Sequence, residues 1–153
     1  MDSNMLKTFI DAVLSVLPML GLTDIKQGNA IEKDKLAAAK DVTILIGLSQ
    51  DIRGNLAYGL SEECARNIAS IMMGGMPVPK FDELAQSAIC ELVNMVTASA
   101  ATNLGSAGKV VNISPPTLVT GQNVKVRVSH EQILAIEFIT SAGTIEINVG
   151  IEC

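Results

Sequence analysis

Residues 83–104 read ELAQSAICELVNMVTASAATNL, a long run of small and apolar residues with few polar ones. Asp82 directly before it is a suitable N-cap, and Gly105 after it is a suitable stop, so the run predicts a long helix. Its alanines allow close backbone approach. The larger residues expected to pack against a core are Leu84, Ile89, Leu92, Met95 and Val96.

Within this helix, Ser87, Glu91 and Asn94 form a polar row. At about 100° per residue, the three positions fall on one helical face. A solvated face is the common explanation for such a row, and a functional site is the other. A carboxamide carries a donor and an acceptor and can hold a water molecule, whereas a carboxylate can engage a cation of a partner. Neither is a strong nucleophile, which favours assisted hydrolysis of an already reactive bond.

Before this helix, apolar spacing predicts a helix, strands and a second helix. Apolar residues recur at helical spacing in residues 6–20, and this first helix is expected to end near 18–21. The other elements expected here are a short strand in 24–32, a loop or turn in 33–40, a β-hairpin made of 42–48 and 55–60, and a helix from Ser61 to Gly74-Gly75.

After the long helix the pattern changes to strands, which are expected at 110–114, 124–130, 134–140 and 144–151. Ser141-Ala-Gly143 is a hairpin signal between the last two. The order of helix, strands, two helices and strands predicts an α+β fold, in which an antiparallel β-sheet packs against two long α-helices, with a shorter additional helix. The length suits a single domain spanning 1–153.

Composition excludes several classes of function. The net charge is −5 and the basic residues are scattered, so nucleic acid is not an expected partner. Cys64, Cys90, Cys153 and His130 have no zinc spacing, and no metal site is expected. Scattered cysteines indicate buried thiols in a reducing compartment. Without a signal peptide or a membrane span, the expected location is cytoplasmic.

The polar row and its surroundings resemble a known family. Ser87-x-x-x-Glu91-x-x-Asn94 resembles the signature of the CheC, CheX and FliY phosphatases of bacterial chemotaxis. Residues 51–65 resemble the family's hairpin entering its second helix, and residues 113–121 resemble the segment that follows its active helix. The similarity runs over nearly the whole chain, and the length matches the CheX branch best. The resemblance implies a CheC-like fold.

The resemblance also implies a function, the dephosphorylation of a CheY-type response regulator that carries an aspartyl phosphate. Asn94 would orient the attacking water, and Glu91 would contact the regulator's invariant lysine. Ser87 would join Glu91 and Asn94 in contacting the partner. The regulator would contribute the aspartyl phosphate and bound Mg²⁺, so no cofactor is expected on this chain.

One departure points to a branch of the family. Two-site relatives such as CheC repeat the motif in their first helix, but residues 9–17 contain no Glu-x-x-Asn. A single active helix is typical of the CheX branch, whose members form dimers that join sheets, so a homodimer through the strand-rich carboxyl end is expected. Two alternatives stay open: a non-catalytic adaptor that binds a phosphorylated regulator or a flagellar switch component through the same helix, and a structural domain with a solvated helix face.

Overall fold

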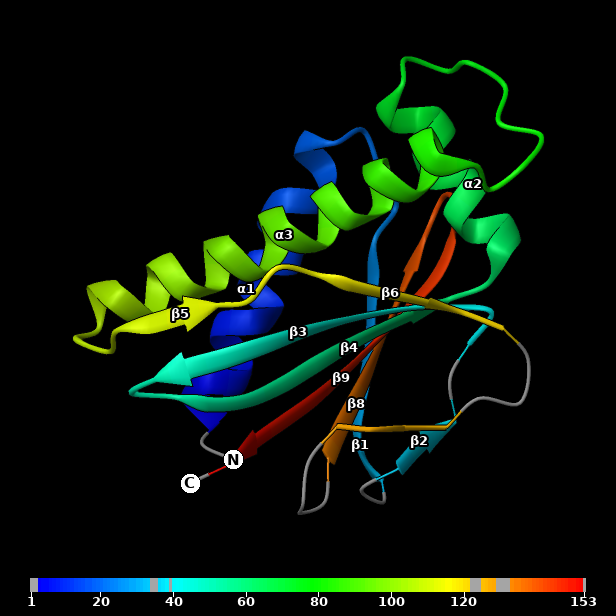
Figure 1. Cartoon of the computed structure of the whole chain (residues 1–153). Coiled ribbons are helices and arrows are strands. Elements are labelled where there is room, and N and C mark those ends of the chain that lie inside the picture. Colours follow the sequence, from blue (N-terminus) through cyan, green and yellow to red (C-terminus); the bar gives the residue numbers. More distant parts are fainter. Residues whose placement is uncertain (1–2, 34–35, 39, 122–124, 129–132, 153) are drawn as a thin grey trace.

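The computed structural model of the chain describes residues 3–33, 36–38, 40–121, 125–128 and 133–152. In this part, helices cover one face of an antiparallel sheet, as the α+β prediction requires (Figure 1). The helices and strands, in chain order, are α1 Ser3–Met19, β1 Lys26–Lys33, β2 Leu36–Ala38, β3 Val42–Gln50, β4 Arg53–Leu60, α2 Glu62–Met72, α3 Glu83–Ser106, β5 Val111–Ile113, β6 Thr117–Thr120, β7 Lys125–Arg127, β8 Ile133–Thr140 and β9 Gly143–Glu152.

The main sheet has seven strands in the order β1-β8-β9-β4-β3-β5, and β6 pairs with β3 next to β5. Both predicted hairpins are confirmed, because β3 pairs with β4 and β8 pairs with β9 in antiparallel register. Gly54 at the start of β4 has φ +153°, and a Cβ there would collide with the carbonyl oxygen of Gly150. The close pairing of β4 with β9 therefore requires glycine at this position.

The core lies between the sheet and the helices. The α1 and α3 helices also pack directly against each other (Figure 1). Aliphatic side chains fill most of the core, which agrees with the low aromatic content of the sequence. The buried residues that α1 and α3 contribute to it are Phe9, Ala12, Val13, Val16, Leu17, Ile89, Leu92, Val93, Val96, Ala100 and Leu104.

Three sequence-based assignments of strands and loops need correction. Residues 33–40 are not a plain loop or turn, because Leu36–Ala38 forms β2, which pairs with β7. The strand expected to be short, β1, has eight residues. Thr117–Thr120 forms β6, which the sequence analysis did not predict. Pro115-Pro116, between β5 and β6, is a signal against a continuing strand. Both strands nevertheless pair with β3.

The second face of the sheet carries a smaller apolar cluster, made of Ala57, Val126, Val128 and Ile133 with the partly buried Leu45. Asn55 donates a hydrogen bond from Nδ2 to the carbonyl oxygen of Val128, at 3.2 Å. Of the strand predicted in 124–130, Lys125–Arg127 is confirmed as β7. Val128 is described but lies beyond the end of β7, and positions 124, 129 and 130, His130 included, lie outside the described residues.

A buried hydrogen-bond chain joins α3 to β4. The Thr97 hydroxyl donates to the carbonyl oxygen of Val93 at 2.8 Å, and this uses its only proton. The Tyr58 hydroxyl, 2.7 Å away, must therefore donate to Thr97 Oγ1. Both side chains are buried, and burial raises the pKa of Tyr58 well above its usual value. These two hydrogen bonds fix which face of α3 turns toward the sheet.

Removing the Thr97 hydroxyl, which accepts the hydrogen bond from Tyr58, should cost more stability than removing the Tyr58 hydroxyl, which donates it. Thr97→Val leaves the buried Tyr58 hydroxyl without an acceptor and should lower the free energy of unfolding by about 1–3 kcal/mol, whereas Tyr58→Phe orphans no donor and should cost about 1 kcal/mol. Urea denaturation measures both, with the exposed Thr102→Val as the control. Equal losses for Thr97→Val and Thr102→Val would show that the hydrogen bond does not hold the helix.

Candidate functional site

The three residues of the polar row lie on the face of α3 that points away from the core. Ser87 and Glu91 are exposed, and Asn94 is half-buried. At about 1.5 Å and 100° per residue, the row spans about 10 Å of the helix axis and about 60° of its circumference. The buried residues of α3 occupy the opposite side, and they are Ala85, Ile89, Leu92, Val93, Val96, Thr97, Ala100 and Leu104.

The polar groups of the row make no polar contacts with other side chains of the described residues. Within the described part of the chain, the side chains of Ser87, Glu91 and Asn94 form neither hydrogen bonds nor ion pairs. Glu146 behaves differently, since its carboxylate lies 3.1 Å from Lys33 Nζ and 4.0 Å from Lys40 Nζ. The carboxylate of Glu91 and the carboxamide of Asn94 are therefore available to a second molecule.

The helix that carries the row is anchored at its start and near its middle. Asp82 caps it, because Oδ1 of this residue accepts a hydrogen bond from the backbone N–H of Ala85 at 2.9 Å. The Gln86 amide donates to the carbonyl oxygen of Phe81 at 3.1 Å. Together with the Tyr58–Thr97 bond, these contacts hold the row on a rigid element, which suits a site that depends on position.

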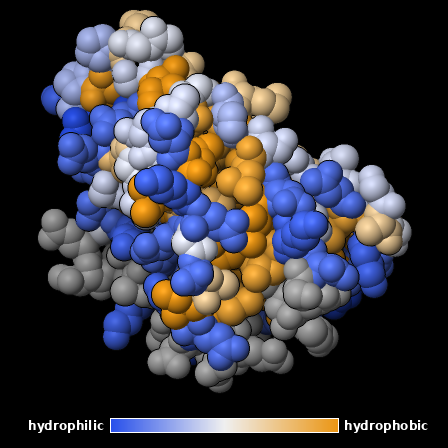
Figure 2. All heavy atoms as spheres, turned by 180° about the vertical axis from the view of Figure 1, so that it is seen from behind, coloured by the Kyte–Doolittle hydropathy of each residue, from blue (hydrophilic) through white to orange (hydrophobic). Residues whose placement is uncertain are grey.

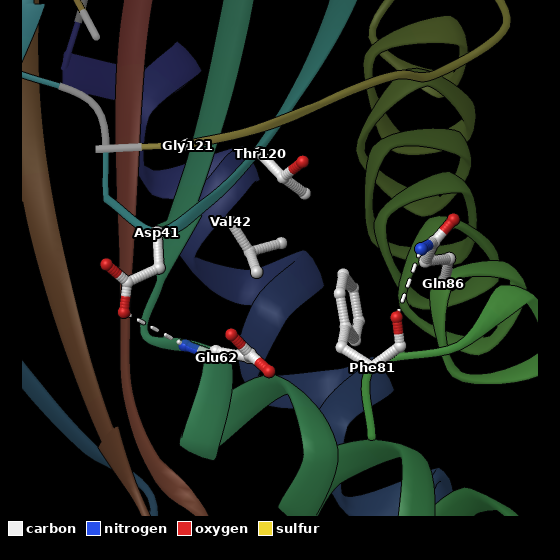
Figure 3. A pocket seen from close by; sticks show the side chains of 7 residues that line it. All are labelled: Asp41, Val42, Glu62, Phe81, Gln86, Thr120 and Gly121. Atoms are coloured by element: carbon white, nitrogen blue, oxygen red, sulfur yellow. Dashed lines mark hydrogen bonds between the residues drawn. The ribbon is translucent and has the colours of Figure 1, made fainter. Parts of the chain in front are cut away.

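A pocket of about 310 Å³ borders the first turns of α3 (Figure 3). Figure 3 shows the carboxylates of Asp41 and Glu62 on one side and the ring of Phe81 on another. The residues that line it are Asp41, Val42, Glu62, Phe81, Gln86, Thr120 and Gly121. The sequence did not single them out, because only the fold brings these separate segments together. The polar row does not line this pocket.

The row therefore lies on a solvent-facing side of α3, outside this pocket. Such a surface can enter a cleft of another macromolecule, where its carboxamide and carboxylate would be desolvated together with the partner's groups. Among the described residues, no group of three or more His, Cys, Asp or Glu side chains is placed to hold a metal ion. No helix in the described part is both long enough and apolar enough to cross a membrane.

The two described cysteines have different environments. Cys64 is buried, and its burial, followed by the charge of Glu63, raises the pKa of the thiol to about 11. Cys90 on α3 is only half-buried, and burial raises its pKa as well. The prediction of buried thiols is thus confirmed for Cys64 and only partly for Cys90, while Cys153 lies outside the described residues.

Comparisons with known proteins agree with the family resemblance and with the fold. Residues 42–139, which include all of α3, match the family model described as Chemotaxis phosphatase CheX. The CheY-P phosphatase CheX of Thermotoga maritima is 36% identical over 128 residues, which cover 83% of this chain and 82% of that protein.

Solved structures extend the agreement to the whole fold. A CheC-like superfamily protein from Shewanella sp. PV-4 superimposes with a TM-score of 0.86 at 29% identity, over 100% of both chains. The CheX-CheY-BeF3-Mg²⁺ complex from Borrelia burgdorferi contains a chain that matches with a TM-score of 0.83 at 25% identity, over 97% of both. The fold thus defines a protein of the CheC-like class, as the resemblance implied.

Within that class, the family model and the Thermotoga relative narrow the assignment. The chain belongs to the CheX family of chemotaxis phosphatases. The family resemblance is confirmed, and the roles of Ser87, Glu91 and Asn94 stay a prediction.

The raised thiol pKa values predict slow alkylation. Because the thiolate is the nucleophile, a pKa of about 11 leaves about one-thousandth of Cys64 reactive at pH 8. Iodoacetamide at pH 8 should therefore modify half-buried Cys90 first and Cys64 only after denaturant is added, as read by peptide mapping with mass spectrometry. Equal rates for Cys64 and Cys90 in the native protein would contradict the assigned burial.

Proposed function

We propose that this chain is a phosphatase that hydrolyses the aspartyl phosphate of a phosphorylated CheY-type response regulator. The similarity to the Thermotoga CheY-P phosphatase CheX supports it, and so does the similarity to a CheX chain in complex with CheY. The single observation that carries the proposal is an exposed Glu91 and a half-buried Asn94 on a rigid helix inside the family-matching region, neither of them paired with another side chain of the described residues.

The reaction needs little covalent chemistry from the protein. A water oxygen attacks phosphorus, the bond from phosphorus to the aspartyl oxygen breaks, and the aspartate leaves as a carboxylate. The proton released by the water passes to phosphate or solvent. Because the acyl phosphate is already labile, catalysis requires mainly positioning and neutralisation of charge. A surface with one carboxamide and one carboxylate can contribute to both.

Asn94 orients the attacking water in this proposal. Its Oδ1 accepts a hydrogen bond from the water and thereby turns a water lone pair toward phosphorus. The half-buried position limits the motion of its side chain, and no intrachain bond within the described residues has to break first. A positioning effect of about 100-fold corresponds to about 2.7 kcal/mol of barrier lowering.

Glu91 pairs with the regulator's lysine, and Ser87 provides a further contact. On the same face as Asn94, an exposed Glu91 carboxylate reaches a cation beside the phosphoryl group when the helix docks. Mg²⁺ belongs to the regulator in this proposal, in keeping with the Mg²⁺ in the Borrelia complex. We place the reaction in the cytoplasm, because unpaired thiols at Cys64 and Cys90 are typical of a reducing compartment.

A homodimer that joins two sheets is part of the proposal, with one change in the strands involved. Strands β8 and β9 are each paired on both sides, so the carboxyl-terminal strands have no free edge. Strand β1 ends the strand order and is the edge we assign to the interface. Figure 2 shows a central band of apolar side chains with hydrophilic margins on the back of the molecule, which also suits burial by a second copy.

The decisive variant is Asn94→Ala. The native protein should accelerate the loss of phosphate from a phosphorylated regulator of the same organism, and Asn94→Ala should lower that acceleration by about 100-fold or more because the water is no longer oriented. Radiolabelled or fluorescent phosphate-release assays measure the rate, and circular dichroism confirms the fold. Asn103→Ala, an exposed asparagine near the end of the same helix, is the matched control and should keep full activity.

The possible outcomes separate the alternatives. Binding of phosphorylated regulators without any acceleration would favour the adaptor. Full activity in both Asn94→Ala and Glu91→Ala would mean that the row is only a solvated face.

A further inference from the structure

An exposed leucine lies beside the proposed site without a role in the fold. Leu84 was expected to pack against the core, but the structure leaves it 65% exposed. The other leucines of α3 behave as expected, since Leu92 is 3% and Leu104 is 5% exposed. Helix propensity does not explain Leu84 either, because glutamine and lysine form helices about as well. Neither the core nor the helix requires an apolar side chain at this position.

The start of the helix does not use Leu84 either. A hydrophobic staple would join the residue before the cap, Phe81, to the fourth helical residue, which is Gln86. Gln86 instead donates a hydrogen bond to the Phe81 carbonyl oxygen. Leu84 is the second helical residue and points outward, away from that contact. Its exposed methyl groups are therefore available to another molecule.

Leu84 continues the face that carries the polar row. It precedes Glu91 by seven positions, a rotation of 700°, which brings it back to within about 20° of the direction of Glu91. With a rise of about 1.5 Å per residue, Leu84 lies about 10 Å along the helix axis from Glu91 and about 15 Å along it from Asn94. A single exposed leucine normally needs no explanation, but this one is aligned with the proposed catalytic row.

The size of a typical protein interface decides whether a docked regulator reaches Leu84. A standard interface covers about 800 Å² on each partner, which is a disc of about 16 Å radius. A regulator centred on the polar row would therefore reach Leu84, which lies about 10 Å along the axis from Glu91. We propose that Leu84 is an apolar docking contact for the phosphorylated regulator, an inference that rests on the proposed phosphatase function. The regulator surface would present an apolar recess about 15 Å from its phosphoryl group.

Leu84 would act on association and not on the chemical step. At this distance it touches none of the reacting atoms, so its loss should weaken binding in the ground state and in the transition state alike. Such a loss raises KM and leaves kcat unchanged. Because the contact is apolar, its contribution should also persist at high salt, where ion pairs made by Glu91 are screened.

The test compares Leu84→Gln with the native protein in steady-state dephosphorylation of a cognate regulator. Leu84→Gln should raise KM about tenfold, which corresponds to about 1.4 kcal/mol, with an unchanged kcat. Leu84→Met, which restores an apolar side chain, should keep the native KM. The matched control is Ile139→Thr, which changes a 49% exposed apolar side chain on β8. Ile139 alternates with the core residues Ile136 and Phe138 and so faces the other side of the sheet.

The outcomes distinguish this inference from the proposed function. No acceleration by the native protein overturns the phosphatase proposal itself. An active native protein with the same KM in Leu84→Gln overturns the docking contact alone, and so does a fall in kcat at unchanged KM. Light scattering on the same samples tests whether a second copy of the chain packs on Leu84 instead of the regulator. A changed oligomeric state in Leu84→Gln would assign this leucine to a dimer contact and overturn the docking contact.

Discussion

The orientation of α3 depends on the hydrogen-bond chain from Tyr58 through Thr97 to the carbonyl oxygen of Val93. An aliphatic surface alone would tolerate some rotation of the helix, but a buried hydroxyl pair tolerates little, because an unpaired buried donor costs about 1–3 kcal/mol. With Thr97 facing Tyr58, the opposite face must point to solvent. A half-turn of the helix would bury the Glu91 carboxylate without a cation, which is a far larger cost. Core packing and site exposure thus follow from one constraint.

That constraint explains why an open helix face can support a reaction. Glu91 and Asn94 need no enclosing pocket of their own if the regulator's surface excludes water when it docks, and the acidic pocket lined by Asp41 and Glu62 lies beside the row without including it. The chain then supplies a positioned carboxamide and a carboxylate, while the phosphoryl group comes with the substrate. In the proposed function, selectivity would depend on the surrounding surface, in which Leu84 is a prominent apolar side chain.

Local signals in the sequence predicted much of this structure. The cap at Asp82 and the hairpin spacing around residues 50–54 specify their elements through neighbouring residues, and both are confirmed. Strands β2 and β7 could not be paired in this way, because their contact joins segments far apart in the chain. The prediction that Leu84 packs against the core was wrong, because it rested on the apolar residue type. The position of Leu84 on the helix, close to the direction of Glu91, places it on the exposed face. The motif directed attention to Asn94, but spacing alone could not distinguish a site from a solvated face.

In the proposed function, this chain holds half of an active site, which a phosphorylated regulator completes. The most direct measurement compares two acyl phosphates under the same conditions, a phosphorylated cognate regulator and free acetyl phosphate with Mg²⁺. We expect faster loss of phosphate from the regulator and no change in the hydrolysis of acetyl phosphate, because the small molecule brings neither the lysine nor the surface that docks α3. Comparable acceleration of both substrates would contradict it and show a site that works without a partner.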